Sequence, residues 1–570
     1  MERKSTIGRA GPRPANQYAD KGKSLKNAWS RHWPLAVALG VLCAVVAGIF
    51  ILCLRTNGGR FVYAVDDIYI ILAVAKNFAT HGVWGVTPYQ FSSSTSTILW
   101  PLLLALIYTL GGTSELVPLF LNVTFAGATL LVVYIILREM GLPQRYQAAG
   151  LLGMVFLAPL PAVIFIGMEH TLQIGISILF VYVVARELAE DEGARSGASP
   201  GLWTLTVILP LVRYEELFLV FAACLLFLAR RRWAEAFGLG VVAALPLTIY
   251  GAIAVDHGWY WLPNSVFLKA NVPHAIGDLR ALPLMGNWEG WTKTADLWVT
   301  ALALLMLLAL LVHQQGTFWR MSSIMMVLVL IAAGLHFRFA RFGVFFRYEA
   351  YLIALSLLVL AVGAYEYLSG RQGRTSSKLE TQLAGAWLGY SLFLPVLVLG
   401  SRGYNSLRHI TQSCHNIYEQ QYQMGLFLRE FYLGVPLAAN DIGSVSYLGE
   451  PHLVDLWGLG SLEVARAKVA GGLTPQQINQ ITKPQGTRIA IVYDSIFYNG
   501  FGGRGGLPAQ WIRVGRWKLL DNYICTEDTV SFYAVDASEE RALIAHLQQY
   551  APRLPPEVVQ SGKYTQSELR

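Results

Sequence analysis

The sequence predicts a polytopic α-helical membrane protein that carries a smaller α/β domain at its C-terminal end. The first observation is composition, because 54% of the 570 residues are hydrophobic and only 14% are charged. A soluble domain cannot bury that much apolar surface. The second observation is order along the chain. Apolar runs long enough to cross a bilayer recur as far as residue 400, and shorter strand-like runs follow.

The N-terminal tail, residues 1–32, is predicted to lie in the cytoplasm. It carries eight Lys and Arg residues against two acidic residues, directly before the first apolar run. A basic tail in this position is retained on the cytoplasmic side of the membrane. Much of the net charge of +8 sits in this tail, so the charge indicates membrane topology and no nucleic-acid partner.

The transmembrane part is predicted to cover residues 33–400 with about eleven spans, of which two are short helices of a hairpin at 202–229. The run 97–111 is predicted to lie along the outer surface, because this choice keeps the Arg-rich loops inside. The first outer loop is then 55–115, and the chain after 400 lies outside. The other predicted spans are 33–54, 116–137, 147–166, 170–187, 236–255, 295–313, 321–336, 349–366 and 381–400.

This topology places charged groups from separate segments on the outer side. Charged side chains at helix ends in a membrane cost desolvation energy, and they commonly mark functional sites. The sequence therefore predicts a site for a charged ligand that carries a lipid tail. The segments are Asp66-Asp67, 167–170, 213–216, 261–269 and 344–349.

Asp66 and Asp67 are the first candidates for chemistry. A carboxylate at the membrane surface can take a proton from a hydroxyl group or bind a divalent cation. The alternative is a helix cap, because Asp before "IYIILAVAKNF" suits the helix dipole. One Asp would suffice as a cap, so the pair indicates that one residue caps the helix and the other has a functional role.

Two further pairs have a functional and a structural interpretation. Glu169 and His170 begin a helix, where they either line a cavity mouth or cap the first turn. Arg213 and Glu215 lie at the tip of the hairpin, where a buried ion pair is one interpretation. The other is phosphate binding, because guanidinium geometry matches phosphate oxygens.

Outward cations run against the positive-inside rule, so each needs a reason. Lys269 and Arg347 are the two that a phosphate-bearing substrate would explain, although Lys269 could also snorkel to the surface. Arg338 and Arg341 have lipid headgroups as their alternative partners. The aromatic residues of the loop 256–294 indicate an interfacial belt, with sugar stacking as the alternative.

Residues 401–570 are predicted to form an α/β domain outside the membrane. An amphipathic helix at 406–432 comes first, followed by strand-like runs at 435–441, 452–458, 488–494 and 530–536, with helices near 461–470 and 538–550. The five cysteines show no metal-ligand spacing. Cys414 and Cys525 could form a disulfide outside the cytoplasm if the fold brings them together.

These residues resemble the GT-C superfamily of integral-membrane glycosyltransferases, which have an Asp-Asp pair in the first outer loop before an apolar helix. Within it, the set of motifs is similar to the bacterial cell-wall arabinofuranosyltransferases and related proteins. The motifs come in the same order over most of 60–460: "DDIYI", "NFATHGVWG", "SSSTSTILWPLLLALI", "GMEHTLQ", "RYEELFLV", "LPNSVFLKA", "FRYEAYLIAL" and "NDIGSVSYLGEPHLVDLWGLG".

The resemblance implies transfer of a sugar, usually with inversion, from a polyprenyl-phosphate donor to a glycan, lipid or protein acceptor outside the bacterial inner membrane. It implies that Asp66 is the base and that Asp67 supports it or binds a divalent cation such as Mg²⁺, Mn²⁺ or Ca²⁺. The departures in "GMEH", "RYEE" and "LPNS" leave the sugar open. The donor site would be lined by Glu169, His170, Arg213, Glu215, Asn264, Lys269 and Arg347.

Three other functions are alternatives. A flippase of lipid-linked sugars would need polar residues at mid-membrane depth and internal symmetry, and the sequence shows neither. A non-catalytic anchor would not need about eleven spans. A ligase that uses diphosphate-linked glycans typically builds its site from a large late loop, whereas the carboxylates here come in the first loop.

Overall fold

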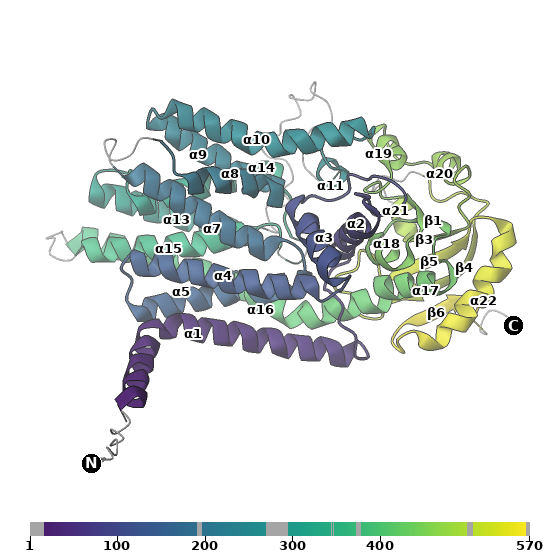
Figure 1. The fold of residues 1–570 in the computed structure, drawn as a ribbon, viewed down its shortest axis with the longest axis horizontal. Helices are drawn as coiled ribbons and strands as arrows, with labels where there is room; N and C mark the ends of the chain where they lie inside the picture. The colour runs from purple at the N-terminus through teal and green to yellow at the C-terminus, as the bar shows by residue number, and fades with distance from the viewer. Residues whose placement is uncertain are drawn as a thin grey trace, which may run out of the picture.

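Long apolar helices lie side by side over most of the chain, and an α/β domain covers one end of them (Figure 1). The computed structural model describes residues 16–190, 197–268, 294–343, 345, 347–371, 378–498 and 505–565. In these ranges, eight helices are long and apolar enough to cross a membrane. They are α1 (Asn16–Thr56), α4 (Val117–Glu139), α7 (His170–Ala189), α10 (Trp233–Asp256), α13 (Ala295–Gln315), α14 (Met321–Phe339), α15 (Ala350–Gly370) and α16 (Lys378–Ile417). The polytopic helical fold is confirmed.

A ninth candidate span is broken, and two helices are short. Helices α5 (Gln144–Leu157) and α6 (Leu160–Ile166) meet at a bend of 40° beside Pro159. Helices α8 (Pro200–Val212) and α9 (Leu217–Ala229) have 13 residues each. At 1.5 Å per residue each measures about 20 Å, less than the roughly 30 Å of a hydrocarbon core. The expected count of about eleven spans included these two short helices, whereas length and composition give eight or nine.

The first outer loop folds into two helices that lie between the bundle and the α/β domain (Figure 1). Helix α2 (Asp67–His81) packs against α3 (Leu99–Gly111). Helix α2 is buried on nearly all sides over residues 68–75, so its continuous apolar sequence serves a core and not a span. The run 97–111, most of which forms α3, therefore packs with α2 beside the α/β domain, and its predicted place at the outer membrane face stays a prediction.

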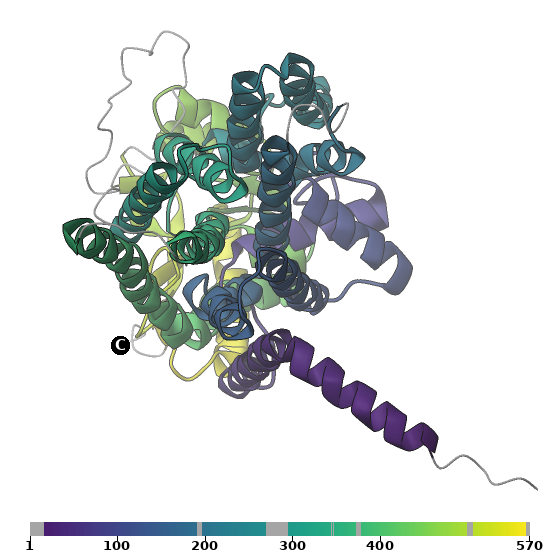
Figure 2. The ribbon, with the colours of Figure 1, turned by 90° about the vertical axis from the view of Figure 1, so that its left-hand side faces the viewer.

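The N-terminal part of α1 projects from the bundle at the end opposite the α/β domain (Figures 1 and 2). At the other end, α16 does not stop near the predicted domain boundary at 400. It runs on through a π-helical turn, η3 (Tyr418–Tyr422), into α17 (Gln423–Phe431). One continuous helical rod therefore links the bundle to the α/β domain, and the predicted amphipathic helix is its outer half.

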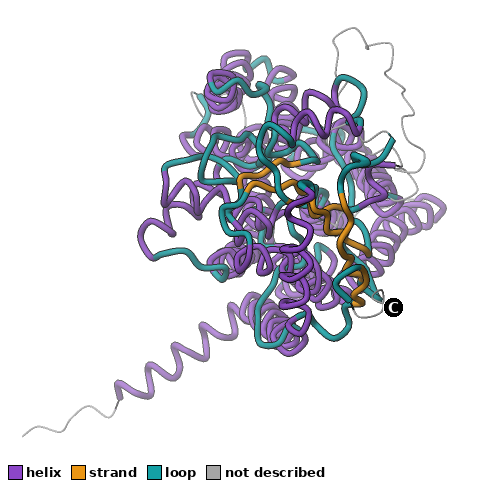
Figure 3. Tube along the Cα trace, turned by 90° about the vertical axis from the view of Figure 1, so that its right-hand side faces the viewer, coloured by secondary structure: helices purple, strands orange, loops and turns teal. Residues whose placement is uncertain are grey.

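The α/β domain is built on a six-stranded sheet with the order β2-β1-β3-β5-β4-β6, whose strands lie in front of the helices in Figure 3. The strands are β1 (Pro436–Ala439), β2 (His452–Asp455), β3 (Ile489–Val492), β4 (Ile512–Lys518), β5 (Thr529–Ala534) and β6 (Val559–Gly562). Strand β1 pairs with β2 and β3 in parallel, and the other pairings are antiparallel. Four of these strands were expected. Strands β4 and β6 were missed, because polar residues interrupt both of them.

Short helices connect the strands and cover the sheet. They are α18 (Gly443–Gly449), α19 (Leu462–Val469), α20 (Pro475–Thr482), α21 (Asp494–Tyr498) and α22 (Glu540–Tyr550). Cys414 and Cys525 are both buried free thiols, so the disulfide that sequence left open is not formed. The Cys525 sulfur lies 3.3 Å from the side-chain oxygen of Gln421, while Cys414 lies beside Cys53 of α1.

Candidate active site

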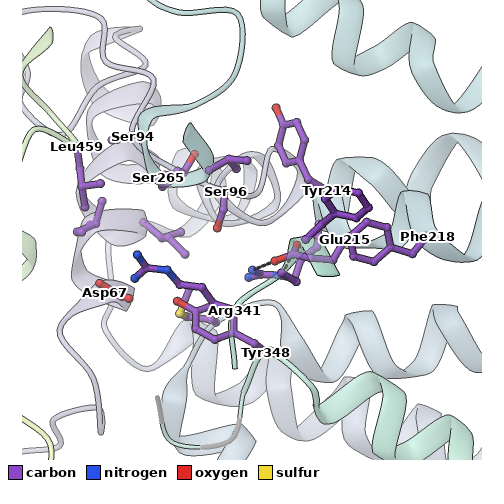
Figure 4. A pocket seen from close by; sticks show the side chains of 18 residues that line it. Asp67, Ser94, Ser96, Tyr214, Glu215, Phe218, Ser265, Arg341, Tyr348 and Leu459 are labelled. Carbon is purple, nitrogen blue, oxygen red and sulfur yellow. Dashed lines mark hydrogen bonds and ion pairs between the residues drawn. The ribbon is translucent and has the colours of Figure 1, made fainter. Parts of the chain in front are cut away.

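A first cavity of about 270 Å³ opens where α2 and α9 begin and α14 ends, and Figure 4 shows its lining. Its wall is largely apolar, with Ile70, Ile71, Met168, Phe218 and Phe339. Polar side chains also line it, from several sides: Asp67, Ser94, Ser96, Arg213, Glu215, Arg341 and Tyr348. An apolar chamber that also exposes charged groups suits an amphipathic ligand whose polar group carries negative charge.

A second cavity of about 190 Å³ lies between the first outer loop and the α/β domain. The residues that follow the parallel strands line it, namely Asn440 and Asp441 after β1, Trp457 after β2, and Tyr493 after β3. Because β2 and β3 lie on opposite sides of β1, the order in which the strands are added reverses there. Ligands in α/β sheets bind in the crevice at such a reversal, outside the carboxyl ends of the strands.

The two cavities meet at a shared wall. Five residues line both of them: Asp67, Ile70, Arg341, Tyr348 and Leu459. A ligand in the apolar chamber and a ligand in the sheet-edge chamber would therefore approach each other beside Asp67. We call these spaces the membrane-side cavity and the sheet-edge cavity.

Asp67 is held at the shared wall by a buried arginine. Its carboxylate pairs with Arg347, whose side chain is only 2% exposed, while the Asp67 side chain is 29% exposed. Arg347 also donates to the Tyr348 hydroxyl at 3.0 Å and to the Met168 sulfur at 3.1 Å. The arrangement fixes the direction of Asp67 and leaves part of its side chain facing the cavities.

Asp66 lines only the sheet-edge cavity and does not cap α2 with its side chain. Its carboxylate accepts hydrogen bonds from the Gly443 and Ser444 amides at 2.7 and 2.8 Å, and from the Ser444 hydroxyl at 2.7 Å. The cap interpretation of Asp66 is therefore wrong. Asp66 instead joins the first outer loop to the start of α18 in the α/β domain.

Gly443 is required at this junction, because a Cβ there would lie 2.2 Å from the Asp66 carbonyl oxygen and 2.4 Å from its carboxylate. We expect Gly443→Ala to destabilise the protein by about 1–3 kcal/mol, the usual cost of overpacking. The measurement is the thermal unfolding midpoint in detergent. Gly389→Ala is the control, since a Cβ at Gly389 in α16 meets nothing within 4 Å. Equal midpoints for the two variants would contradict the tight junction.

Asp66 also faces a second carboxyl group, that of Asp441. Burial, followed by the negative charge of Asp441, raises the pKa of Asp66 well above its usual value of 3.8. Burial also raises the pKa of Asp441, against hydrogen bonds donated by Gln421 and Tyr493 at 2.9 Å each. Two neighbouring buried carboxyl groups cannot both ionise readily, so the pair retains a proton to higher pH than either group would alone.

The raised pKa values make stability depend on pH. The folded state keeps protons on Asp66 and Asp441 that the unfolded state loses above about pH 4. The contribution of this pair to the free energy of unfolding is therefore greatest below that pH. It falls as the pH rises through the folded pKa values. We expect Asp441→Asn to flatten this fall, since the amide cannot ionise and can donate to Asp66. Thermal midpoints between pH 4 and 8 measure it, with Asp256→Asn at the exposed end of α10 as control. Parallel curves for wild type and Asp441→Asn would contradict the paired carboxyls.

Glu169 and Glu215 hold Arg213 in a buried ion-pair cluster. The guanidinium donates to Glu169 at 2.6 Å and to Glu215 at 2.8 and 3.1 Å, and the Arg213 side chain is 2% exposed. The side chain of Glu169 makes no cap bond to α7, so the cap interpretation fails here too. His170 is fully buried and its Nδ1 lies 3.2 Å from Gln173. The structure shows the ion pair of Arg213, and phosphate binding by Arg213 and Glu215, which both line the membrane-side cavity, stays a prediction.

The remaining residues that were predicted to line the donor site have different outcomes. Asn264 is buried and lines neither cavity; its amide donates to the Gly458 carbonyl at 2.8 Å, which ties α11 (Asn264–Phe267) to the α/β domain. Its neighbour Ser265 lines the membrane-side cavity. Lys269 lies outside the described residues. The metal expected at Asp67 fits poorly, because the Arg347 guanidinium already neutralises that carboxylate from within the site.

Sequence reasoning missed two residues of the site. Arg341 was assigned to lipid headgroups, yet it is an exposed cation that lines both cavities, and no acidic side chain in the described ranges forms an ion pair with it. Asp441 lies in the motif "NDIGSVSYLGEPHLVDLWGLG", which was noted only for its resemblance. The outward position of Arg341 after a span was the available signal for the first. No local signal linked Asp441 to Asp66.

Comparisons with known proteins give a short family match and distant structural likenesses. A family model described as a domain of unknown function, DUF8728, matches residues 415–533. No curated protein matches the chain. Among solved structures, the chain is similar to ArnT from Cupriavidus metallidurans bound to undecaprenyl phosphate, with 12% identity and a TM-score of 0.45 over 88% of this chain and 98% of that one.

The apo form of the same ArnT gives 12% identity and a TM-score of 0.45 over 88% of this chain and 99% of that one. The oligosaccharyltransferase of Archaeoglobus fulgidus, in complex with zinc and sulfate, gives 11% identity and a TM-score of 0.40 over 85% and 73%. Likenesses at this level assign no function to this chain, so function has to be argued from the two cavities.

Proposed function

We propose that this protein is a GT-C-type glycosyltransferase. It would move a sugar from a polyprenyl-phosphate donor to an acceptor hydroxyl at the outer face of the membrane that it spans. The observation that carries the proposal is the meeting of two chemically different cavities at Asp67. A transferase with a lipid-borne donor and a polar acceptor needs such a pair of chambers with a carboxylate between them. The order of the sequence motifs, which resembles that superfamily, agrees with this reading.

The donor is assigned to the membrane-side cavity. Its apolar wall where α9 begins and α14 ends suits the first isoprene units, and Arg341 offers an exposed guanidinium to the phosphate. The buried cluster of Arg213 with Glu169 and Glu215 would position the Tyr348 ring, since Arg213 lies 5.4 Å from the ring centroid. A guanidinium binds phosphate oxygens with matched geometry, which gives Arg341 a role in holding the leaving group.

The acceptor is assigned to the sheet-edge cavity, whose polar lining includes Asn440, Asp441 and Tyr493 of the α/β domain. Its hydroxyl oxygen would attack the anomeric carbon while the bond from that carbon to the phosphate oxygen breaks. The proton passes to a carboxylate, and the departing phosphate takes the bonding electrons and gains one negative charge. Arg341 stabilises this new charge at the shared wall.

Asp67 is our candidate for the base, with Asp66 as a positioning residue. Sequence analysis assigned the base to Asp66. A base must reach the acceptor hydroxyl, yet the Asp66 carboxylate already accepts three hydrogen bonds from residues 443 and 444 and is 7% exposed. Asp67 is more exposed and lines both cavities. Geometry thus favours the second Asp of the pair.

The deciding experiment is donor turnover by the purified chain in lipid nanodiscs. A panel of polyprenyl-phosphate pentoses and hexoses is offered with short glycan, lipid and peptide acceptors, and released polyprenyl phosphate is measured. Release that depends on the acceptor supports the proposal and identifies the sugar. Folded protein that turns over no donor would overturn it, and movement of intact donor between leaflets would then favour the flippase alternative.

A further inference from the structure

Three metal-ligand side chains converge at the junction of α16 with the C-terminal segment, outside both cavities. One ligand atom each from His415, Glu419 and Glu557 lies within 4.8 Å of the others. His415 lies in the last turn of α16, Glu419 follows in the π-helical turn, and Glu557 precedes β6. Among the described residues, this is the group of three or more His, Cys, Asp or Glu side chains with spacing suited to a metal ion.

The histidine is oriented as a metal ligand would be. Its Nδ1 lies 3.0 Å from the Oδ1 of Asn57, a fully buried residue just after α1. Because that oxygen can only accept, Nδ1 carries the proton and Nε2 is left with its lone pair. Nε2 in turn lies 3.3 Å from Glu419. A ligating histidine commonly donates its other ring N–H to a carbonyl or carboxylate in this way.

The two carboxylates complete the arrangement. Glu419 is 6% exposed at its side chain, and its second oxygen accepts from the Asn416 amide at 3.3 Å. Glu419 lies in a π-helical turn, a local irregularity that is frequent at functional sites. Glu557 is exposed, and the His415 side chain is 23% exposed, so an ion has a path from solvent.

We propose that His415, Glu419 and Glu557 bind one divalent transition-metal ion of the Zn²⁺ class. One imidazole with two carboxylates and a water molecule is a donor set that Zn²⁺ accepts in tetrahedral geometry. The ion would join the rod of α16 and η3 to the segment before β6 (Figure 1). Its role would be to fasten the α/β domain to the helix that leaves the bundle.

The competing explanation is an ion pair between His415 and Glu419 alone, four residues apart on one helical rod. An ion pair needs a charged imidazole and no Glu557, whereas a metal ion needs a neutral imidazole and all three ligands. Glu557→Gln therefore separates the two. Its exposed position makes this substitution harmless to folding.

The test uses the full-length chain without an affinity tag, purified in detergent, stripped with EDTA and titrated with Zn²⁺ by calorimetry. We expect saturable binding of one Zn²⁺ per chain and a rise in the thermal midpoint. Glu557→Gln and His415→Gln should each weaken binding at least about tenfold and remove the rise. Glu463→Gln, an exposed residue of α19 outside the cluster, is the matched control.

Two results would overturn the proposal. The first is no saturable Zn²⁺ binding by wild-type protein. The second is equal affinity in wild type and Glu557→Gln, which would leave only the His415–Glu419 ion pair or binding elsewhere. Neither result bears on sugar transfer, because the cluster lines neither the membrane-side nor the sheet-edge cavity.

Discussion

Replacing Asp67 by asparagine is expected to lower sugar transfer by about 10²–10⁴-fold, the usual contribution of a general base. Asparagine keeps the shape and one acceptor oxygen for Arg347, so the buried guanidinium retains a partner. The loss should therefore fall on kcat, and the thermal midpoint should also fall, because the buried Arg347 loses its counter-charge. The measurement is the initial rate of polyprenyl phosphate release at saturating donor.

Two companion variants make the Asp67 result interpretable. Asp66→Asn weakens the bonds to Gly443 and Ser444, so we expect a lower thermal midpoint and a smaller loss of kcat than for Asp67→Asn. Asp256→Asn makes the same chemical change at an exposed residue outside both cavities and should leave both quantities unchanged. If Asp66→Asn abolishes transfer in a stable protein and Asp67→Asn does not, the base is Asp66.

Replacing Arg341 by glutamine is expected to raise the KM for the lipid-phosphate donor by roughly 10- to 100-fold. A hydrogen bond to a charged group contributes about 1.5–3 kcal/mol, and each 1.4 kcal/mol is a factor of about ten. Arg341 is exposed, so its loss should leave the thermal midpoint unchanged. Because the phosphate gains charge as the sugar leaves, kcat should fall as well. Rates over a range of donor concentrations separate the two effects.

Arg338 supplies the control for Arg341, because it lies three residues earlier, at the same end of α14, and lines neither cavity. If both arginines only bind lipid headgroups, Arg338→Gln and Arg341→Gln will change the donor KM equally. A change confined to Arg341→Gln supports a phosphate site at the shared wall. An unchanged KM in Arg341→Gln would remove Arg341 from the donor site.

Most of the helices could be predicted from the sequence, because a bilayer demands long apolar segments that satisfy their own backbone hydrogen bonds. The same local logic predicted that Asp66-Asp67, 167–170, 213–216 and 344–349 lie on one side, and Asp67, Met168, Arg213 and Tyr348 do line one cavity. Loop charges then indicated that the run 97–111 does not cross. The short hairpin was predicted too. Hydropathy does not show how far a helix enters the membrane, so its two 13-residue helices were counted as spans.

Which Asp of the pair binds the α/β domain and which pairs with Arg347 could not be predicted, because neighbouring residues have the same local sequence context. It depends on contacts that cross the chain: Asp66 meets Gly443 across 377 positions, while Asp67 meets Arg347 across 280. The ion pair of Arg213 with Glu169 at 2.6 Å likewise joins two distant segments, which no local pattern could indicate. Hydropathy and charge are local properties, so they predict helical segments and the side of the membrane on which a loop lies. Burial, charge pairing and cavity walls arise only when distant segments pack together.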